Sequence, residues 1–314
     1  MINDDVYVPG KRTQRFRRQG NSGGTGGFNA TMKSFKQALQ VAPEKLIPIG
    51  DIVFDNVTMR EAVDRVVEMA HKKDRARYVC TANLDHLAMC ETDDSFREIY
   101  RRADMVLADG MPVVWLSQPH VMGSLSARVA GSDLFWEVAK VSAKNNLRLF
   151  FMGGSPGSAD LAAEAIKGMY PGAQVVGTYC PAFETFNTDE EQERIRTAIR
   201  DTNPDVLMVG LGAPKQEKWI SANKDLIGVP VSIGVGGSFE MAGGVVRRAP
   251  VWMQKTGLEW SYRLLQEPRR LWNRYVQRDI PYLLGLAPGA ARMARFRVGT
   301  ALQTMKDDKA AAEE

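Results

Sequence analysis

The chain has 314 residues, 44% of them apolar, so it can bury one large core or two smaller ones. The net charge is only +4, yet residues 247–300 carry 11 Lys/Arg against 3 Asp/Glu, and residues 1–45 carry 8 against 3. Residues 46–246 are acidic, with 20 Lys/Arg against 27 Asp/Glu. Two basic ends on an acidic body predict an anionic partner, either a membrane surface or a nucleic acid.

The cysteines and the apolar runs exclude several classes of protein. Cys80, Cys90 and Cys180 are odd in number and lack CxxC spacing, which argues against disulfides and structural zinc and favours a reducing compartment. No apolar run approaches the roughly 18 residues of a membrane-spanning helix, and the N-terminus has no apolar signal core. We therefore expect a cytoplasmic protein, either soluble or peripheral on a membrane.

Residues 1–45 are rich in Gly, Arg, Asn and Ser. We expect a disordered basic extension with a short helix near Met32–Val41, or a tail that serves only solubility. Apolar runs and helical patterns then alternate over residues 46–246. This alternation predicts an α/β domain, a mostly parallel sheet with helices on both faces.

The expected elements follow from local patterns. We expect strands at 46–54, 77–80, 105–108, 147–154, 174–176, 206–209 and 231–235. We expect helices after the N-cap Thr58, from Asn83 to about Arg102, from Ser132 or Asp133 to Asn145, at Pro156–Tyr170, at Asp189–Arg200 and from Pro214.

Residues 247–300 have a different character. Trp260, Leu264, Leu271 and Tyr275 recur at near-helical spacing among arginines, and Pro268 and Pro281 are expected to divide the segment into short helices. This pattern predicts either amphipathic helices in a lipid headgroup layer or a C-terminal helix that packs on the body with a solvated arginine face. Residues 301–314 are expected to be a disordered tail.

Ligands of open α/β sheets bind beyond the carboxyl ends of the strands. The residues at those ends are small, polar or glycine: Thr81, Asn83, Asp109, Gly153, Gly154, Lys215, Gln216, Gly236, Gly237 and Glu240. This set of residues suits the binding of a phosphorylated, hydroxyl-rich ligand and the transfer of one proton.

Each of these positions also has a purely structural interpretation. Asp109 would be a general base or would hydrogen-bond its own Asp-Gly turn. Arg128 would bind a phosphate or carboxylate, or form a surface salt bridge. Lys215 and Gln216 would bind sugar or phosphate, or begin a solvated helix. The GGSPGS turn at 153–158 suits a diphosphate, but the next strand end lacks the carboxylate that NAD binding requires.

The sequence offers poor material for a metal site. Only His71, His86 and His120 are present, none in an HxxxH pattern, and the chain has no Asp-x-Asp motif. Phosphate chemistry is therefore expected to rely on arginines, lysines and backbone dipoles, without a cofactor.

Taken together, eight motifs resemble the WecG/TagA/CpsF family of bacterial glycosyltransferases (glycosyltransferase family 26). They occur in family order over about residues 46–275: TANLDHL (81–87), LADGMPVVW (107–115), RVAGSDL (128–134), FFMGGSPG (150–157), GLGAPKQEKW (210–219), GVGGSFEMAGG (234–244), RRAPVWM (247–253) and GLEWSYRLLQEPRR (257–270). The resemblance implies a Rossmann-like domain with a C-terminal appendage that docks on the membrane and helps to close the site.

The resemblance also implies an activity. Members of the family transfer a sugar from a UDP-sugar to a polyprenyl-diphosphate-linked saccharide at the cytosolic membrane face, with inversion and without metal, in the synthesis of surface polysaccharides. By motif, Asp109 would be the general base and Thr81, Asn83 and Gln216 would bind the sugar. The leaving UDP would be stabilised by charged groups and backbone N–H groups, with these candidates: Arg128, Gly153, Gly154, Arg263, Arg270 and, more weakly, Arg274.

The donor sugar stays open among N-acetylmannosamine, its uronic acid, glucose and glucuronic acid. The alternative function is a non-catalytic regulator or scaffold that binds a nucleotide-sugar. A nucleic-acid partner is disfavoured, because the basic tail alternates with Trp and Leu and no recognition module is visible. A homo-oligomer or a regulatory protein partner is compatible with the sequence.

Overall fold

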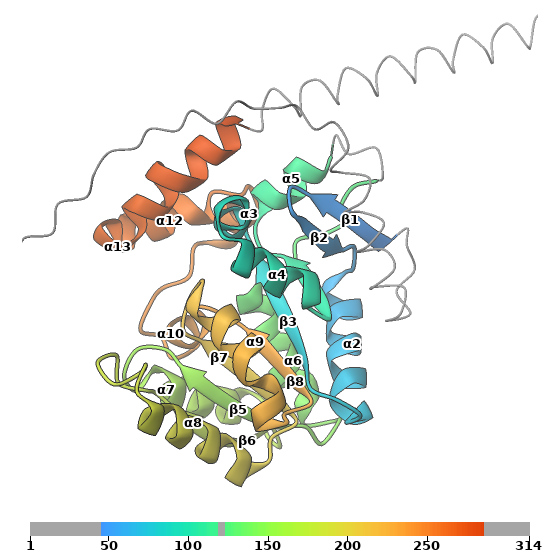
Figure 1. The fold of residues 1–314 in the computed structure, drawn as a ribbon, viewed down its shortest axis with the longest axis vertical. Helices are drawn as coiled ribbons and strands as arrows, with labels where there is room; N and C mark the ends of the chain where they lie inside the picture. Colours follow the sequence, from blue (N-terminus) through green and yellow to red (C-terminus); the bar gives the residue numbers. More distant parts are fainter. Residues whose placement is uncertain (1–44, 119–122, 286–314) are drawn as a thin grey trace, which may run out of the picture.

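A computed structural model describes residues 45–118 and 123–285 of the protein (Figure 1). The expected helix at 32–41 and the expected tail at 301–314 lie outside these residues. The central feature is a six-stranded sheet, and every strand pair in it is parallel. Its order is β4 (Met105–Ala108), β3 (Arg77–Ala82), β8 (Val231–Gly234), β7 (Val206–Gly210), β5 (Arg148–Gly153) and β6 (Gln174–Tyr179).

Alternate residues of the inner strands face opposite cores, which is why those strands are mostly apolar. Tyr78 and Cys80 of β3 pack on one side, whereas Val79 packs on the other. The first side is covered by α3 (Leu84–Thr92), α4 (Asp94–Arg102), α8 (Asp189–Thr202) and α9 (Lys215–Ile227). The second is covered by α2 (Met59–Lys72), α6 (Gly131–Ser142), α7 (Ser158–Met169) and α10 (Ser238–Ala242). The predicted α/β sheet with helices on both faces is confirmed.

Several boundaries differ from the prediction for local reasons. The expected first strand is a hairpin of β1 (Leu46–Ile49) and β2 (Ile52–Asp55), because the chain reverses at Gly50, whose φ is +55°. The expected long helix after Asn83 is two helices, since the Asp93 side chain caps α4. Neither Ser132 nor Asp133 caps α6; Ala130 is the N-cap, so both lie in the first turn. The Thr58 cap is confirmed, with a capping box to Glu61.

Residues 247–285, here called the appendage, continue the chain as short helices. These are α11 (Val251–Lys255), α12 (Glu259–Gln266), α13 (Pro268–Trp272) and the π-helix η2 (Asn273–Asp279), followed by helical residues 280–285. Pro268 begins α13 as expected, but Pro281 does not end the helix. The wide π-helical turns just before Pro281 leave room for a ring that would collide with the preceding carbonyl in a regular α-helix.

The appendage lies at the carboxyl-end edge of the sheet. In Figure 1 the appendage helices lie on the same side of the molecule as α3, and η2 contacts α3 directly. The appendage also contacts α5 (Met111–Ser117): Gly257 has a φ of +72°, and its Cα approaches the Trp115 ring so closely that an added Cβ would lie 2.5 Å from it. A glycine is therefore required where the appendage meets the body.

Candidate active site

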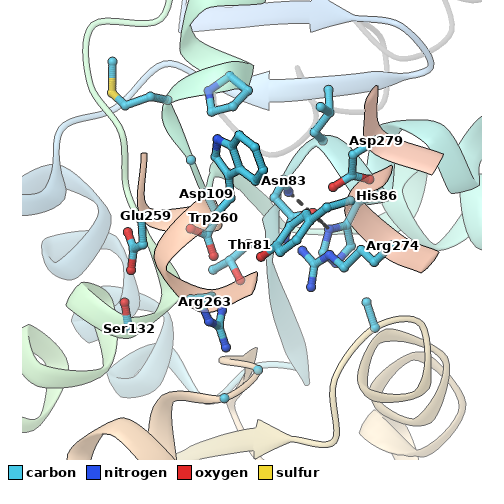
Figure 2. Close-up of a pocket in the computed structure, with 18 of the residues that line it drawn as sticks. Thr81, Asn83, His86, Asp109, Ser132, Glu259, Trp260, Arg263, Arg274 and Asp279 are labelled. Atoms are coloured by element: carbon cyan, nitrogen blue, oxygen red, sulfur yellow. Dashed lines mark hydrogen bonds between the residues drawn. The ribbon is translucent and has the colours of Figure 1, made fainter. Parts of the chain in front are cut away.

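A cavity of about 430 Å³ lies between the carboxyl ends of β3, β4 and β8 and the appendage (Figure 2). The parallel sheet gathers these strand ends at one edge, as expected for an α/β ligand site. The predicted residues that line the cavity are Thr81, Asn83, Asp109, Arg128, Gln216, Gly236, Gly237 and Arg263.

Asp109 follows the last residue of β4 and faces this cavity. Its backbone N–H donates to the Ala82 carbonyl at 2.8 Å, and its Oδ2 accepts from the Gly131 N–H of α6 at 3.4 Å. Burial and the nearby Glu259 carboxylate raise the pKa of Asp109, while Arg128 and the Gly131 N–H oppose the shift. The carboxylate thus binds a proton more tightly than an ordinary aspartate does, which suits a general base.

Arg128 belongs to a closed ring of four charged side chains. It donates to Glu259 of α12 and to Asp133 of α6, each at 2.9 Å. Arg248 donates to the same Asp133 at 2.6 Å and lies 3.7 Å from Glu259. Arg128 is therefore no simple surface salt bridge, because the ring joins the body to both ends of the segment that leads into α12.

The cavity floor is held by hydrogen bonds between strand ends. Thr81 Oγ1 donates to the Gly234 carbonyl at 2.9 Å, linking β3 to β8. Gln216 accepts from the Gly236 N–H through Oε1 at 3.0 Å and donates through Nε2 to Glu217 at 2.8 Å. One donor and one acceptor thus fix the orientation of the Gln216 amide. Gln216 is therefore a rigid part of the cavity wall, and it does not simply begin a solvated helix.

Asn83 and His86 form a second polar unit at the end of β3. The Asn83 side chain caps α3 by accepting from the Asp85 N–H at 3.1 Å, and its Oδ1 lies 2.8 Å from His86 Nδ1. His86 is buried, stacks on Phe96, and places its Nε2 3.4 Å from the buried Glu217 carboxylate. The cap therefore fixes the orientation of a histidine that lines the cavity.

The appendage contributes two further arginines to the cavity. Arg263 of α12 reaches the glycine turn after β8, with Nη2 3.1 Å from the position that a Gly237 Cβ would occupy. Its buried Nε has no hydrogen-bond partner among the described residues. Arg274 of η2 forms an ion pair with Asp85 at 3.3 Å, and Arg278 pairs with the same carboxylate. Asp85 therefore fastens η2 to α3.

Asp279 is a buried carboxyl group of η2 at the edge of the cavity. Burial and the charge of Asp85 raise the pKa of Asp279 from 3.8 to about 7, against the opposing effects of Arg274, Arg278 and His86. The folded protein therefore keeps a proton on Asp279 at a pH where the unfolded chain has lost it.

This difference predicts that stability falls as the pH rises from about 4 to about 7, because the folded state binds more protons over that window. The raised pKa of Asp279 corresponds to a loss on the order of 1–3 kcal/mol in the free energy of unfolding across this window. The variant Asp279→Asn should not show this loss. Thermal unfolding and hydrogen exchange of η2 at pH 5 and pH 8 measure it. An unchanged pH dependence in the variant would contradict the assignment.

Comparison with known proteins adds to this geometry. The sequence matches the family model described as "Glycosyl transferase WecG/TagA/CpsF family" over residues 47–295. The chain belongs to this family. Three relatives, from Staphylococcus aureus strains MW2, NCTC 8325 and COL, are each 30% identical over 226 residues, or 72% of this chain and 86% of theirs. Each is named N-acetylglucosaminyldiphosphoundecaprenol N-acetyl-beta-D-mannosaminyltransferase.

Some predicted residues of this WecG/TagA/CpsF-family chain do not line the cavity. Gly153 and Gly154 belong to a turn whose N–H groups serve the protein itself: Gly154 donates to the Gly210 carbonyl and Ser155 donates to Glu240, each at 2.8 Å. Both glycines have positive φ and little room for a Cβ. The expected diphosphate site at this turn is therefore occupied by packing and by Glu240.

Two further predicted residues lie elsewhere. The Lys215 ammonium lies 4.2 Å from the centre of the exposed Phe183 ring, away from the cavity lining. Arg270 lies in α13, and its side chain is outside what the structure describes. Arg274, one turn further along, lines the cavity instead, so the weaker of the two sequence candidates is the one that the fold brings to the site.

Three residues that line the cavity, His86, Glu259 and Asp279, were not among the predicted site residues. His86 was considered only as a metal ligand, although its position three residues after Asn83 is the spacing of a capping box. Glu259 and Asp279 line the cavity without any local signal, because each depends on how the appendage docks. Over residues 45–118 and 123–285, no group of three or more His, Cys, Asp or Glu side chains could hold a metal ion.

Proposed function

We propose that this protein transfers a sugar from a UDP-sugar to a polyprenyl-diphosphate-linked saccharide, with inversion and without a metal ion. The family and the relatives' names support glycosyl transfer to such a lipid, and N-acetylmannosamine becomes the first donor sugar to test. The observation that carries the proposal is the Asp109 carboxylate, which faces a cavity whose other walls hold several guanidinium groups.

In this reaction Asp109 takes the proton from the acceptor hydroxyl as that oxygen attacks C1 of the donor sugar. The C1–O bond to UDP breaks, and the electron pair leaves with the diphosphate. A base of this kind contributes roughly 10²–10⁴-fold to the rate. Its raised pKa improves it as a proton acceptor, while the neighbouring Arg128 opposes the shift.

The departing diphosphate needs positive charge more than it needs a proton. Among the described residues Arg263 Nε has no hydrogen-bond partner, its Nη2 lies beside the glycine turn after β8, and Arg128 can exchange Glu259 for a phosphate. These guanidinium groups support a mechanism in which arginines do the work that a divalent cation does elsewhere. Thr81, Asn83 and Gln216 then orient the sugar from the cavity floor.

The appendage is proposed to hold the protein on the cytosolic face of the membrane, in the synthesis of a bacterial surface polysaccharide. Its exposed apolar side chains include Trp252, Leu265, Trp272 and Leu284, and its arginines suit anionic headgroups. None of the described helices is both long and apolar enough to cross a bilayer. We propose that residues 46–246 form the catalytic domain and that residues 247–300, of which the appendage is the described part, form the membrane-associating segment.

The test is transfer from a panel of UDP-sugars to a short polyprenyl-diphosphoryl N-acetylglucosamine, read by mass spectrometry. We expect one product, with inverted configuration, at a rate that excess EDTA changes by less than about twofold, since no step needs a metal. UDP binding without transfer to any acceptor would instead favour the alternative, a nucleotide-sugar-binding regulator or scaffold. Loss of transfer in EDTA with recovery in Mg²⁺ would contradict the metal-free mechanism.

A further inference from the structure

Glu217 is a buried carboxylate that touches two residues of the cavity wall from behind. It lies in the first turn of α9 and is 1% exposed, and its Oε2 has no hydrogen-bond partner among the described residues. Its Oε1 accepts from Gln216 Nε2 at 2.8 Å and lies 3.4 Å from His86 Nε2. Gln216 and His86 both line the cavity. Because a buried carboxylate costs free energy to keep, this placement suggests a function beyond packing.

The direction of the hydrogen bonds in this wall is set by a backbone group. The Gly236 N–H can only donate, so the Gln216 amide must turn its Oε1 toward it, at 3.0 Å. Gln216 Nε2 then faces Glu217, where it needs an acceptor. The amide is also closely packed, since a Cβ at Gly234 would lie only 2.8 Å from Nε2. Glu217 Oε1 is therefore required as an acceptor at this point of the wall.

His86 approaches the same oxygen from α3. A bare lone pair on Nε2 would face the lone pairs of the Glu217 carboxylate, so the contact is favourable only when Nε2 carries a proton. His86 Nδ1 lies 3.2 Å from the Asn83 N–H, which suits a neutral ring, and 2.8 Å from Asn83 Oδ1, which suits a protonated one. Both contacts are compatible with a proton on Nε2. That proton points into the wall at Glu217 and not into the cavity.

We propose that Glu217 is a positioning residue for the transfer reaction, which acts by accepting one hydrogen bond from Gln216 and one from His86. A single oxygen thereby joins α9, which carries Gln216, to α3, which carries His86 and is capped by Asn83. Gln216 in turn holds the glycine turn after β8 through the Gly236 N–H. This role rests on the proposed function, because Gln216 and Asn83 are the residues proposed to orient the sugar.

Two conservative variants separate hydrogen bonding from charge. Glu217→Gln removes the charge but keeps a carbonyl oxygen that can accept both bonds, so kcat/KM should stay within about threefold of the wild type. Glu217→Asp keeps the charge but has a shorter side chain, which withdraws the oxygen from both donors. The misplaced wall should then lower kcat/KM by about 10- to 100-fold. Glu164→Gln and Glu164→Asp, at an exposed position of α7, are the matched controls and should leave the rate unchanged.

The histidine ring gives a readout that packing alone would not change. The chain has only three histidines, so nitrogen NMR of the full chain with labelled histidine resolves each ring, and His86→Phe assigns the His86 signals. We expect a proton on Nε2 in the wild type and in Glu217→Gln. In Glu217→Asp we expect Nε2 to lose this proton while Nδ1 donates to Asn83 Oδ1. His71 is the internal reference, because its Nε2 lies 3.0 Å from the Asn145 carbonyl and should stay protonated throughout.

The results that overturn the proposal are specific. A bare His86 Nε2 in the wild type contradicts the direction of the hydrogen bonds in the wall. Unchanged transfer by Glu217→Asp, or a loss in Glu217→Gln as large as that in Glu217→Asp, shows that accepting these bonds is not the role of Glu217. If the wild type transfers nothing, the proposed function fails. The ring signals then decide the position of Glu217 alone, and a proton that stays on His86 Nε2 in Glu217→Asp overturns it.

Discussion

Asp109→Asn should abolish sugar transfer while leaving the fold and UDP binding nearly intact. The asparagine keeps the size of the side chain and can still accept from the Gly131 N–H, but it cannot take a proton. We expect kcat to fall by about 10²–10⁴-fold with little change in the affinity for UDP. Transfer assays and calorimetric UDP titration measure the two quantities, and Asp64→Asn on the exposed face of α2 is the control.

The wild-type pH profile gives an independent check on Asp109. Because burial and Glu259 raise its pKa, the acid limb of kcat/KM should fall at a higher pH than an unperturbed aspartate would give. Glu259→Gln should move this limb toward lower pH, since it removes a negative charge beside the base. Retention of more than about a tenth of the wild-type rate in Asp109→Asn would remove Asp109 from the mechanism, because a general base is worth at least 10²-fold.

Replacing the exposed apolar residues of the appendage should detach the protein from membranes. Trp252, Leu265, Trp272 and Leu284 are 60%, 80%, 52% and 67% exposed, so serine at all four positions costs the free protein little packing. Each side chain that a bilayer buries contributes about 1.5–3 kcal/mol, so the fourfold variant should bind anionic vesicles more than about 100-fold more weakly. Vesicle flotation measures the bound fraction.

The control for this loss lies on the body. Phe183 and Leu226 are 76% and 57% exposed, and replacing both by serine should leave flotation unchanged. Transfer to a lipid acceptor in vesicles should fall with binding, while UDP binding should not. Equal flotation of the fourfold variant and the wild type would contradict the proposal that the appendage binds the membrane.

The sequence predicted the sheet well because its strands are buried on both sides. Continuous apolar runs ending in glycine or polar residues mark such strands, and β4 was predicted to the residue. Features that depend on tertiary context were not predictable from local pattern. Pro281 breaks a regular helix but not one that follows a π-helix, and the first strand became a hairpin at Gly50.

The site divides in the same way. Asp109, Asn83 and Gln216 stand at strand ends, so periodicity alone puts them near one another at the sheet edge. The ring of Arg128, Asp133, Arg248 and Glu259 joins residues up to 131 positions apart in the sequence, and no local sequence pattern predicts it. The turn at Gly153 and Gly154 has the pattern of an anion site, but the neighbouring Gly210 carbonyl and Glu240 take its N–H groups.

The order of strands in the sheet has a consequence for how the protein is made. Before β8 is synthesised, the strands of the six-stranded sheet can form only two separate ladders, β4–β3 and β7–β5–β6, with no hydrogen bond between them. Asp109 belongs to the first ladder, and Gln216 follows the second. Insertion of β8 between β3 and β7 brings the two together, and the appendage follows in the chain directly after the short helix α10. The edge of the sheet that lines the cavity is therefore completed only shortly before the segment proposed to bind the membrane is synthesised, so few nascent chains have one without the other.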